Sequence, residues 1–209
     1  MRLMGDFLFP NGITALGVRL AGHATKVQDM ARTRWRDWLA SVKDGINILS
    51  QSCVNIFLVE LLMGGALGFL AASTNQVDGI IAKSTPYEIA SDWRIKFSKP
   101  ISIFYPTIEK EANDLNNRDL AKAYIEYPFY PTRSIAELVY LLNHLHTQLI
   151  KINTPGLLTN SKSDHSVPIS HIRKYQQLLA SCKIETLILE KSRHIIQTTL
   201  KRNWFSTQV

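Results

Sequence analysis

The sequence predicts an α/β fold, in which a mostly parallel β-sheet carries helices on both faces within a single domain of residues 1–209. The chain has 209 residues, of which 45% are hydrophobic, and this is enough for one sizeable core. Short strand-like runs alternate with longer stretches that have helical periodicity. The strand-like runs are mainly apolar, as parallel strands covered on both faces are.

The predicted strands are short runs rich in Val, Ile, Leu and Phe. They span residues 13–20, 56–61, 77–82, 154–160 and 184–189. The predicted helices repeat apolar residues every three or four positions, which places those residues on one face. They span residues 33–50, 63–72, 134–151 and 195–204, and a further helix begins at Pro168.

Two of these helix starts carry residues that commonly cap helices. Thr33 is a candidate N-cap for the helix that runs to about Ser50. Ser134 and Glu137 match a capping box, in which each side chain accepts a hydrogen bond from the backbone N–H of the other residue. We therefore expect both helices to begin at these side chains.

Residues 84–132 interrupt the alternation of strands and helices. Five prolines and nine aromatic residues fall in this stretch. A long insertion of this composition favours a helical lid over a hydrophobic site, and a partly ordered loop is the alternative.

Charge and histidine spacing argue against several classes of partner. The net charge is +7, but the 24 Lys and Arg residues are spread along the chain without a run of five. The basic stretch 32–36 predicts a solvated helix edge rather than a nucleic-acid patch. His144 and His146 are two positions apart on a predicted helix, so they point to different faces and do not form a metal pair. We expect no nucleic-acid partner, no metal and no cofactor.

The cysteines and the N-terminus bear on location. Cys53 and Cys182 lie far apart and outside any Cys-x-x-Cys motif, which predicts buried thiols in a reducing compartment rather than a disulfide. Residues 1–6 lead into neither a long apolar core nor the small-residue cleavage site of a signal peptide. Together these features predict a cytoplasmic protein.

One apolar run offers a membrane alternative. Val54 to Ser73 is 20 residues long with a single charge, at Glu60, and this length suffices to cross a bilayer. The paired Gly64 and Gly65, and the change from a strand-like to a helix-like pattern, favour instead a buried strand followed by a buried helix.

The same run has the layout of a catalytic turn without its reactive atom. An apolar strand, a sharp turn and a helix start rich in small residues form the nucleophile elbow of an α/β-hydrolase, with the pattern Gly-x-Ser-x-Gly. Here Glu60 takes the place of the first Gly and Leu62 the place of the Ser, while Gly64 matches the last Gly. Leucine has no hydroxyl with which to attack a carbonyl.

An acid and a histidine follow in the chain order that this fold uses. Asp164 comes after the strand predicted over residues 154–160, and His194 comes after the strand that ends at Leu189. Both are therefore expected at the carboxyl ends of strands, where open α/β sheets bind ligands. On spacing alone, Asp164 is either a helix N-cap or a catalytic acid, and a lone His194 is also typical of a surface histidine.

The whole chain resembles the carboxylesterase and monoacylglycerol-lipase-like group of bacterial α/β-hydrolases, which is related to the serine aminopeptidases. The resemblance rests on five segments in order, at residues 19–25, 33–38, 61–67, 160–168 and 190–196. Their family patterns are R-L-P-G-H-G-T, T-x-W-x-D-W, L-S-M-G-G-A-L, H-S-R-x-D-x-x-V-P and E-N-S-G-H-V-I. The resemblance implies that Asp164 stands at the triad acid, His194 at the base and the backbone N–H of Met63 at the oxyanion hole.

The departures from the family cluster at the expected site. Leu62 replaces the nucleophilic Ser, Glu60 replaces the Gly that opens the elbow, and Arg193 replaces the Gly before the base. The family also carries an H-G-F-type loop that supplies a second oxyanion donor. Met1 to Asn11 resembles the helix that follows that loop, so the resemblance implies an N-terminally truncated chain that lacks the first strands. One lost oxyanion donor costs about a hundred- to a thousandfold in rate.

In the family a strand runs between the segments that match residues 13–20 and 56–61. Without it, we expect either two unfilled edges or new pairing between the neighbours. The expected function is acyl ester hydrolysis by ancestry, impaired at Leu62, with a small acyl ester or lipid-like ligand. The alternatives are a non-catalytic lipid-binding or scaffold protein, and a membrane protein anchored through residues 54–73. The sequence leaves the oligomeric state open.

Overall fold

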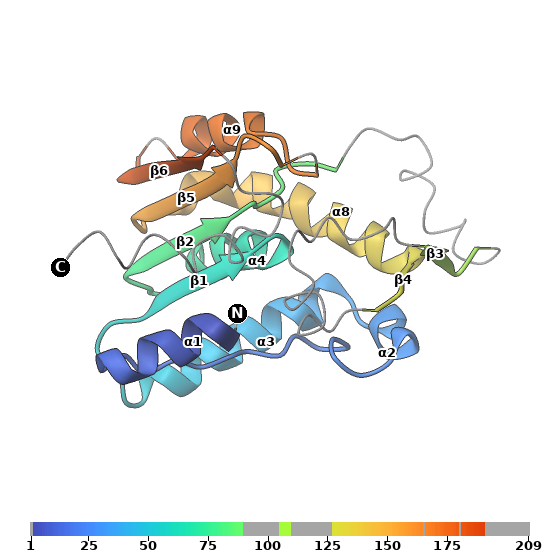
Figure 1. The fold of residues 1–209 in the computed structure, drawn as a ribbon, viewed down its shortest axis with the longest axis horizontal. Helices are drawn as coiled ribbons and strands as arrows, with labels where there is room; N and C mark the ends of the chain where they lie inside the picture. The colour runs from blue at the N-terminus through green and yellow to red at the C-terminus, as the bar shows by residue number, and fades with distance from the viewer. Residues whose placement is uncertain (1, 90–104, 110–126, 165, 180, 191–209) are drawn as a thin grey trace.

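The computed structural model describes residues 2–89, 105–109, 127–164, 166–179 and 181–190. Its main sheet has four parallel strands in the order β1-β2-β5-β6 (Figure 1). The bounds of the strands are Phe57–Leu61 for β1, Gly79–Lys83 for β2, Gly156–Ser161 for β5 and Ile184–Leu189 for β6. The prediction of a mostly parallel α/β sheet is confirmed.

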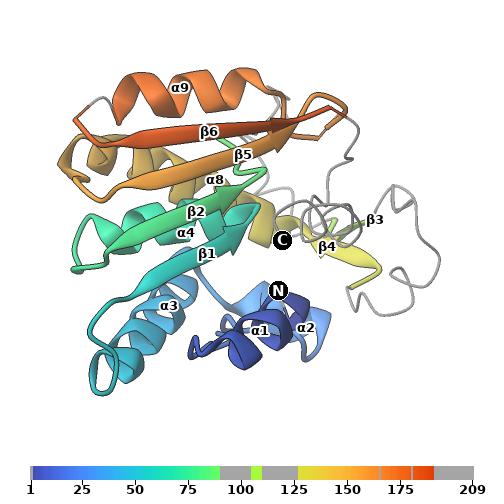
Figure 2. The same ribbon diagram turned by 60° about the vertical axis from the view of Figure 1, so that its left-hand side comes forward.

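Helix α4 (Met63–Ala72) lies at the centre of the core. It packs on β1 and β2, and its Ala66, Leu67 and Phe69 are fully buried. This helix is apolar all round, as a helix enclosed on every side is. Helices α3 (Trp35–Ser50) and α8 (Thr132–Gln148) pack against it, and Figure 2 shows α4 and α8 behind the strands.

Helix α9 (Ser170–Leu178) contacts α4, because its Tyr175 stacks on Phe69 of α4 with ring centroids 5.2 Å apart. The helix predicted over residues 195–204 lies outside the described residues. Of the predicted elements, the helix 63–72 and the strand 184–189 match the structure at both ends.

Smaller elements surround this core. They are α1 (Arg2–Leu8), η1 (Phe9–Asn11), α2 (Val27–Arg32) and η2 (Leu149–Lys151), and an antiparallel pair of β3 (Thr107–Glu109) and β4 (Phe129–Pro131). The antiparallel pair falls in the insertion 84–132. Residues 90–104 and 110–126 of that insertion lie outside the described residues, so the lid stays a prediction.

The strand predicted over residues 13–20 is wrong. In the structure this segment forms no strand pairing, and most of its side chains are exposed. It lies along α3 instead, where Val18 contacts the backbone of Gly45 closely enough to exclude a side chain at that position. β1 likewise pairs only with β2 among the described strands. A local pattern of strand-forming residues makes no strand without a neighbour. Neither expected outcome is seen: residues 13–20 form no strand edge and do not pair with β1, and among the described strands β1 alone borders the gap.

Both predicted helix caps are wrong. α3 begins at Trp35, and the Thr33 hydroxyl accepts a hydrogen bond from the indole N–H of Trp38 at 2.9 Å instead of capping the helix. α8 begins at Thr132, ahead of Ser134, whose hydroxyl donates to the carbonyl of Met30. The Thr33 hydroxyl is thus engaged by residues close to it in the sequence, whereas Ser134 bonds to a residue about a hundred positions earlier.

The membrane reading of residues 54–73 is also wrong, because the run divides into strand β1 and the ten-residue helix α4. Within the part of the chain that the structure describes, every helix is too short or too polar to cross a bilayer.

Candidate functional site

Leu62 connects β1 directly to α4 in a strained turn. Its backbone has φ 55° and ψ −125°, a conformation with positive φ that a bulky residue rarely adopts. The Leu62 N–H donates to the Lys83 carbonyl at 2.9 Å, and the Leu62 carbonyl accepts from the Gly65 N–H at 3.0 Å. These bonds hold the residue between the end of β2 and the first turn of the helix. The geometry is that of a strand-to-helix elbow, with an aliphatic side chain where the hydroxyl would stand.

Gly65 allows the helix to start this close to the sheet. A Cβ at this position would overlap the hydroxyl of Thr85, which follows β2. Any side chain at residue 65 would therefore push α4 away from the loop after β2. This close contact explains why α4 begins with small residues.

Glu60 lies beneath α4 and reaches the helix where it has glycines. A Cβ on Gly64 would come within 2.6 Å of the Glu60 carboxylate, and one on Gly68 within 3.1 Å of its Cγ. Burial raises the pKa of Glu60 to about 7, against the opposing charge of Lys83. Burial also lowers the pKa of Lys83 to about 8, and the charge of Glu60 opposes that shift. A partly buried acid and a buried base thus lie beside the elbow.

Sequence reasoning missed Lys83 as a member of this pair. Lys83 is only 2% exposed at the end of β2. The available signal was a lysine at the end of an apolar strand, since buried lysines require a compensating group.

Asp164 lies three residues beyond the end of β5 and is 6% exposed. One carboxylate oxygen, Oδ1, accepts the backbone N–H groups of Ser166 and Val167, each at 2.9 Å. The N-cap of α9 is Ile169, so the alternative that Asp164 caps this helix is wrong. The two bonds fix the carboxylate within its own loop, at the carboxyl end of the sheet.

Asn160, which the sequence analysis did not single out, supports that loop. Its Nδ2 donates to the carbonyl of Val167 at 2.9 Å, and its Oδ1 accepts from the backbone N–H of Ser161 at 2.8 Å. The Ser84 hydroxyl donates to the same oxygen at 3.3 Å. This network joins the ends of β2 and β5 and positions the Asp164 loop.

The structure therefore brings several predicted site residues to one edge of the sheet. Leu62, Met63 and Asp164 all follow parallel strands at their carboxyl ends, and Met63 is the first residue of α4. β1 and β5 are two strand spacings apart, or about 10 Å. The first N–H groups of a helix have no partner within the helix, which applies to the Met63 N–H. His194 lies outside the described residues.

Comparisons with known proteins bear on the family and the fold of this chain. No protein-family model matches the chain. A thermostable monoacylglycerol lipase from Bacillus sp. (strain H-257) is 31% identical over 197 residues, which make up 93% of this chain and 77% of the lipase. This chain belongs to the monoacylglycerol lipase family of α/β-hydrolases.

Solved structures agree on the fold of this family member. One of two metagenome-derived lipolytic enzymes, LipS and LipT, superposes with a TM-score of 0.80 at 23% identity, over 96% of this chain and 86% of that one. The monoacylglycerol lipase of Paleococcus ferrophilus superposes with a TM-score of 0.65 at 18% identity, over 78% of this chain and 67% of that one.

The loop that matches the family's R-L-P-G-H-G-T segment is held by Tyr127. The Tyr127 hydroxyl accepts the Thr25 N–H at 2.7 Å and donates to the Gly22 carbonyl at 3.0 Å. Gly22 has φ 72°, and a Cβ there would lie 2.8 Å from the Cα of Met30. Burial lowers the pKa of His23 in the same loop. In this family member the loop is therefore held by hydrogen bonds to Tyr127, which lies more than a hundred positions later in the chain.

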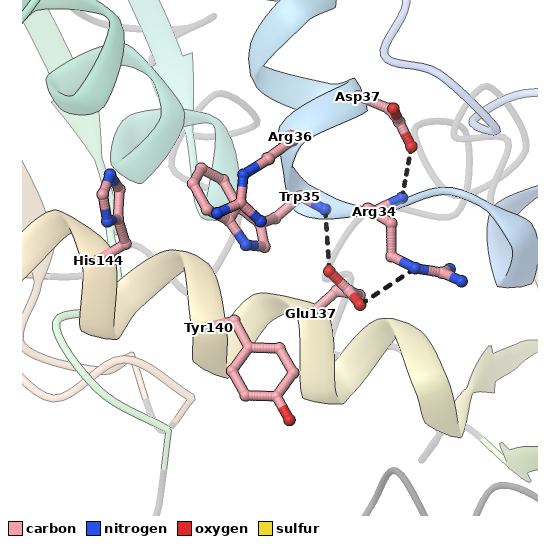
Figure 3. Close-up of a pocket in the computed structure, with 7 residues that line it drawn as sticks. All are labelled: Arg34, Trp35, Arg36, Asp37, Glu137, Tyr140 and His144. Atoms are coloured by element: carbon pink, nitrogen blue, oxygen red, sulfur yellow. Dashed lines mark hydrogen bonds and ion pairs between the residues drawn. The ribbon is translucent and has the colours of Figure 1, made fainter.

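The structure also has an open cleft between α3 and α8, and none of the predicted site residues lines it (Figure 3). Its lining residues are Arg34, Trp35, Arg36, Asp37, Glu137, Tyr140 and His144. The Glu137 carboxylate accepts the Trp35 N–H at 3.2 Å and pairs with Arg34 at 3.5 Å, while Arg36 lies over the Trp35 ring at 4.4 Å. These polar groups are engaged with one another and join the two helices. We regard the cleft as structural rather than as the catalytic site.

Proposed function

We propose that this monoacylglycerol-lipase-family protein is an impaired ester hydrolase, which takes up a small acyl ester or lipid-like ligand at the carboxyl edge of its sheet and hydrolyses it only at a residual rate, because Leu62 excludes the serine mechanism. The observation that carries the proposal is Leu62 in the strained elbow, with φ 55°. The turn that would present a nucleophile is kept, while the side chain on it has no nucleophilic atom.

The proposal assigns Asp164 and His194 to the acid and base positions, as the family resemblance implies. The buried Asp164 carboxylate, fixed by two backbone N–H groups, supports the acid assignment. Without a hydroxyl at residue 62, the base has only water to deprotonate. Enzymes that lose one member of the triad keep a small residual rate over water, and we expect no more than such a rate here.

A second candidate function is a non-catalytic binder of apolar ligands. Leu62 itself favours it, because an aliphatic side chain at the elbow would extend an apolar floor where a serine would be polar.

The two free and half-buried cysteines, Cys53 and Cys182, support the proposal of a reducing compartment such as the cytoplasm. The sequence predicts buried thiols, and the structure shows both only partly buried.

The test uses four proteins: the parent chain, Leu62→Ser, Leu62→Ala, and Leu62→Ser combined with Glu60→Gly. Each is treated with a short aryl ester and with a serine-reactive fluorophosphonate. We expect no label on residue 62 in the parent or in Leu62→Ala, which is the size-reduced control. Label and turnover in either serine variant would place residue 62 at the reacting atom. Parent turnover at enzyme-like rates would overturn the proposal.

Glu60→Gly is included because the family has glycine at this position and because Glu60 presses on the start of α4. A Leu62→Ser protein that gains activity only when Glu60→Gly is also present would show that the buried carboxylate misplaces the elbow. Fatty-acid binding, measured by thermal shift in the parent, separates the second candidate. A shift without ester turnover supports a binder, and no shift argues against it.

A further inference from the structure

The chain segment Pro86–Glu88, just after β2, is held in place by side chains from two helices. The Tyr87 N–H donates to Nδ1 of His171 on α9 at 3.2 Å. The Tyr87 carbonyl pairs with Nε2 of His146 on α8 at 2.9 Å, and the Tyr87 ring stacks on the His146 ring at 4.0 Å. One residue thus has both its backbone polar groups bound by imidazoles.

Side chains of α9 also bind the two neighbours of Tyr87. The Tyr175 hydroxyl donates to the Pro86 carbonyl at 2.9 Å, and Lys174 pairs with Glu88 at 2.6 Å. The segment forms no strand pairing in the described structure, so these side chains replace the backbone bonds that a sheet would supply.

The two histidines respond differently to a proton. A backbone N–H is always a donor, so Nδ1 of His171 has to be an unprotonated acceptor, and the ring is neutral. Protonation would set an N–H of His171 against the N–H of Tyr87, and the bond would be lost. Nε2 of His146 faces a carbonyl and therefore carries a hydrogen already, so protonation of its ring keeps that bond.

We propose that His171 is an acid-sensitive latch that holds the Pro86–Glu88 segment against α8 and α9 at neutral pH and releases it in acid. The latch is independent of whether the protein cleaves esters. It bears on the elbow because the carbonyl of Lys83, three residues before Pro86, accepts the Leu62 N–H, and Thr85 contacts Gly65. Release of the segment would free one wall of the elbow.

The charges around His171 set the direction of the response. Glu88 on the held segment and Asp164 on the loop after β5 favour the imidazolium, while Lys174 on its own helix opposes it. Three further titratable groups lie beside Tyr87: His146 on α8, and Lys174 and Tyr175 on α9. Burial outweighs these charges and lowers the pKa of His171, as an acceptor role requires. Protonation, and with it release, is therefore expected below pH about 6.5, the ordinary value for histidine.

The first test is hydrogen exchange at the Tyr87 amide of the full chain between pH 7.5 and 5, corrected for the intrinsic pH dependence of exchange. Loss of one hydrogen bond predicts about a tenfold loss of protection in acid. His171→Asn places a non-titrating acceptor near Nδ1 and should make protection independent of pH. His146→Gln is the matched control and should keep the acid response.

A second measurement needs no variant. The ¹⁵N shifts of the His171 ring at pH 7.5 should show a neutral ring with its hydrogen on Nε2. A hydrogen on Nδ1 at neutral pH, or Tyr87 protection that is the same in acid as at pH 7.5, would overturn the latch. So would a His171→Asn protein that folds and keeps the parent's acid response.

Discussion

Replacing Leu62 by glycine and by alanine measures the strain in the elbow. At most positions a glycine is less stable than an alanine by about 0.5–1 kcal/mol, because it loses more backbone freedom on folding. At φ 55° and ψ −125° the order should reverse, since this conformation suits glycine and costs other residues about 1–3 kcal/mol. Both variants remove the same leucine side chain beyond Cβ, so their difference isolates the backbone term.

Subtracting the ordinary penalty of glycine from the strain leaves Leu62→Gly more stable than Leu62→Ala by about 1 kcal/mol. For a chain of this size that corresponds to about 2–4 °C in Tm. Urea unfolding of the two variants gives the free energies directly, provided that both have the same m-value. If Leu62→Gly is the less stable variant by the usual margin, residue 62 is not in the elbow conformation, and the assignment of the site loses its basis.

Two further predictions concern contacts behind the elbow. Gly65→Ala should destabilise the fold by about 1–3 kcal/mol in urea unfolding, because its new Cβ overlaps the Thr85 hydroxyl. The control is Gly17→Ala, which should be near neutral because Gly17 has open space around it. Equal effects at the two sites would contradict the close contact. Because burial raises the pKa of Glu60 to about 7, the folded state binds this proton more tightly than the unfolded state does. The free energy of unfolding should therefore fall as pH rises from about 4.5 to about 7, and Glu60→Gln should remove that slope. An unchanged slope in Glu60→Gln would assign the titration to another group.

The sequence was most informative where the local pattern and the burial agree. The junction of β1 and α4 was predicted because an apolar strand runs straight into a helix of small residues, and both need burial wherever they are placed. The position of Asp164 after β5 followed from the same alternation. The segment 13–20 has an equally good strand pattern, yet a strand depends on a neighbour that no local pattern contains.

The remaining features depend on contacts across the chain. Glu137 looked like half of a capping box, but it accepts the N–H of Trp35, about a hundred residues earlier. The electrostatic influence between Glu60 and Lys83 and the bond from Tyr87 to His171 likewise link different elements. Periodicity shows which face of an element is buried, but it does not show which polar groups meet there.

The outer side of β1 has a practical consequence for anyone handling this protein. Strand Phe57–Leu61 contains neither proline nor lysine, which commonly prevent an edge strand from pairing with a strand of another molecule. Phe57 is also 60% exposed. Concentrated samples should therefore form intermolecular β-structure and precipitate sooner than dilute ones. Turnover, exchange and unfolding data should be compared at two or more protein concentrations before any difference between variants is assigned to the elbow.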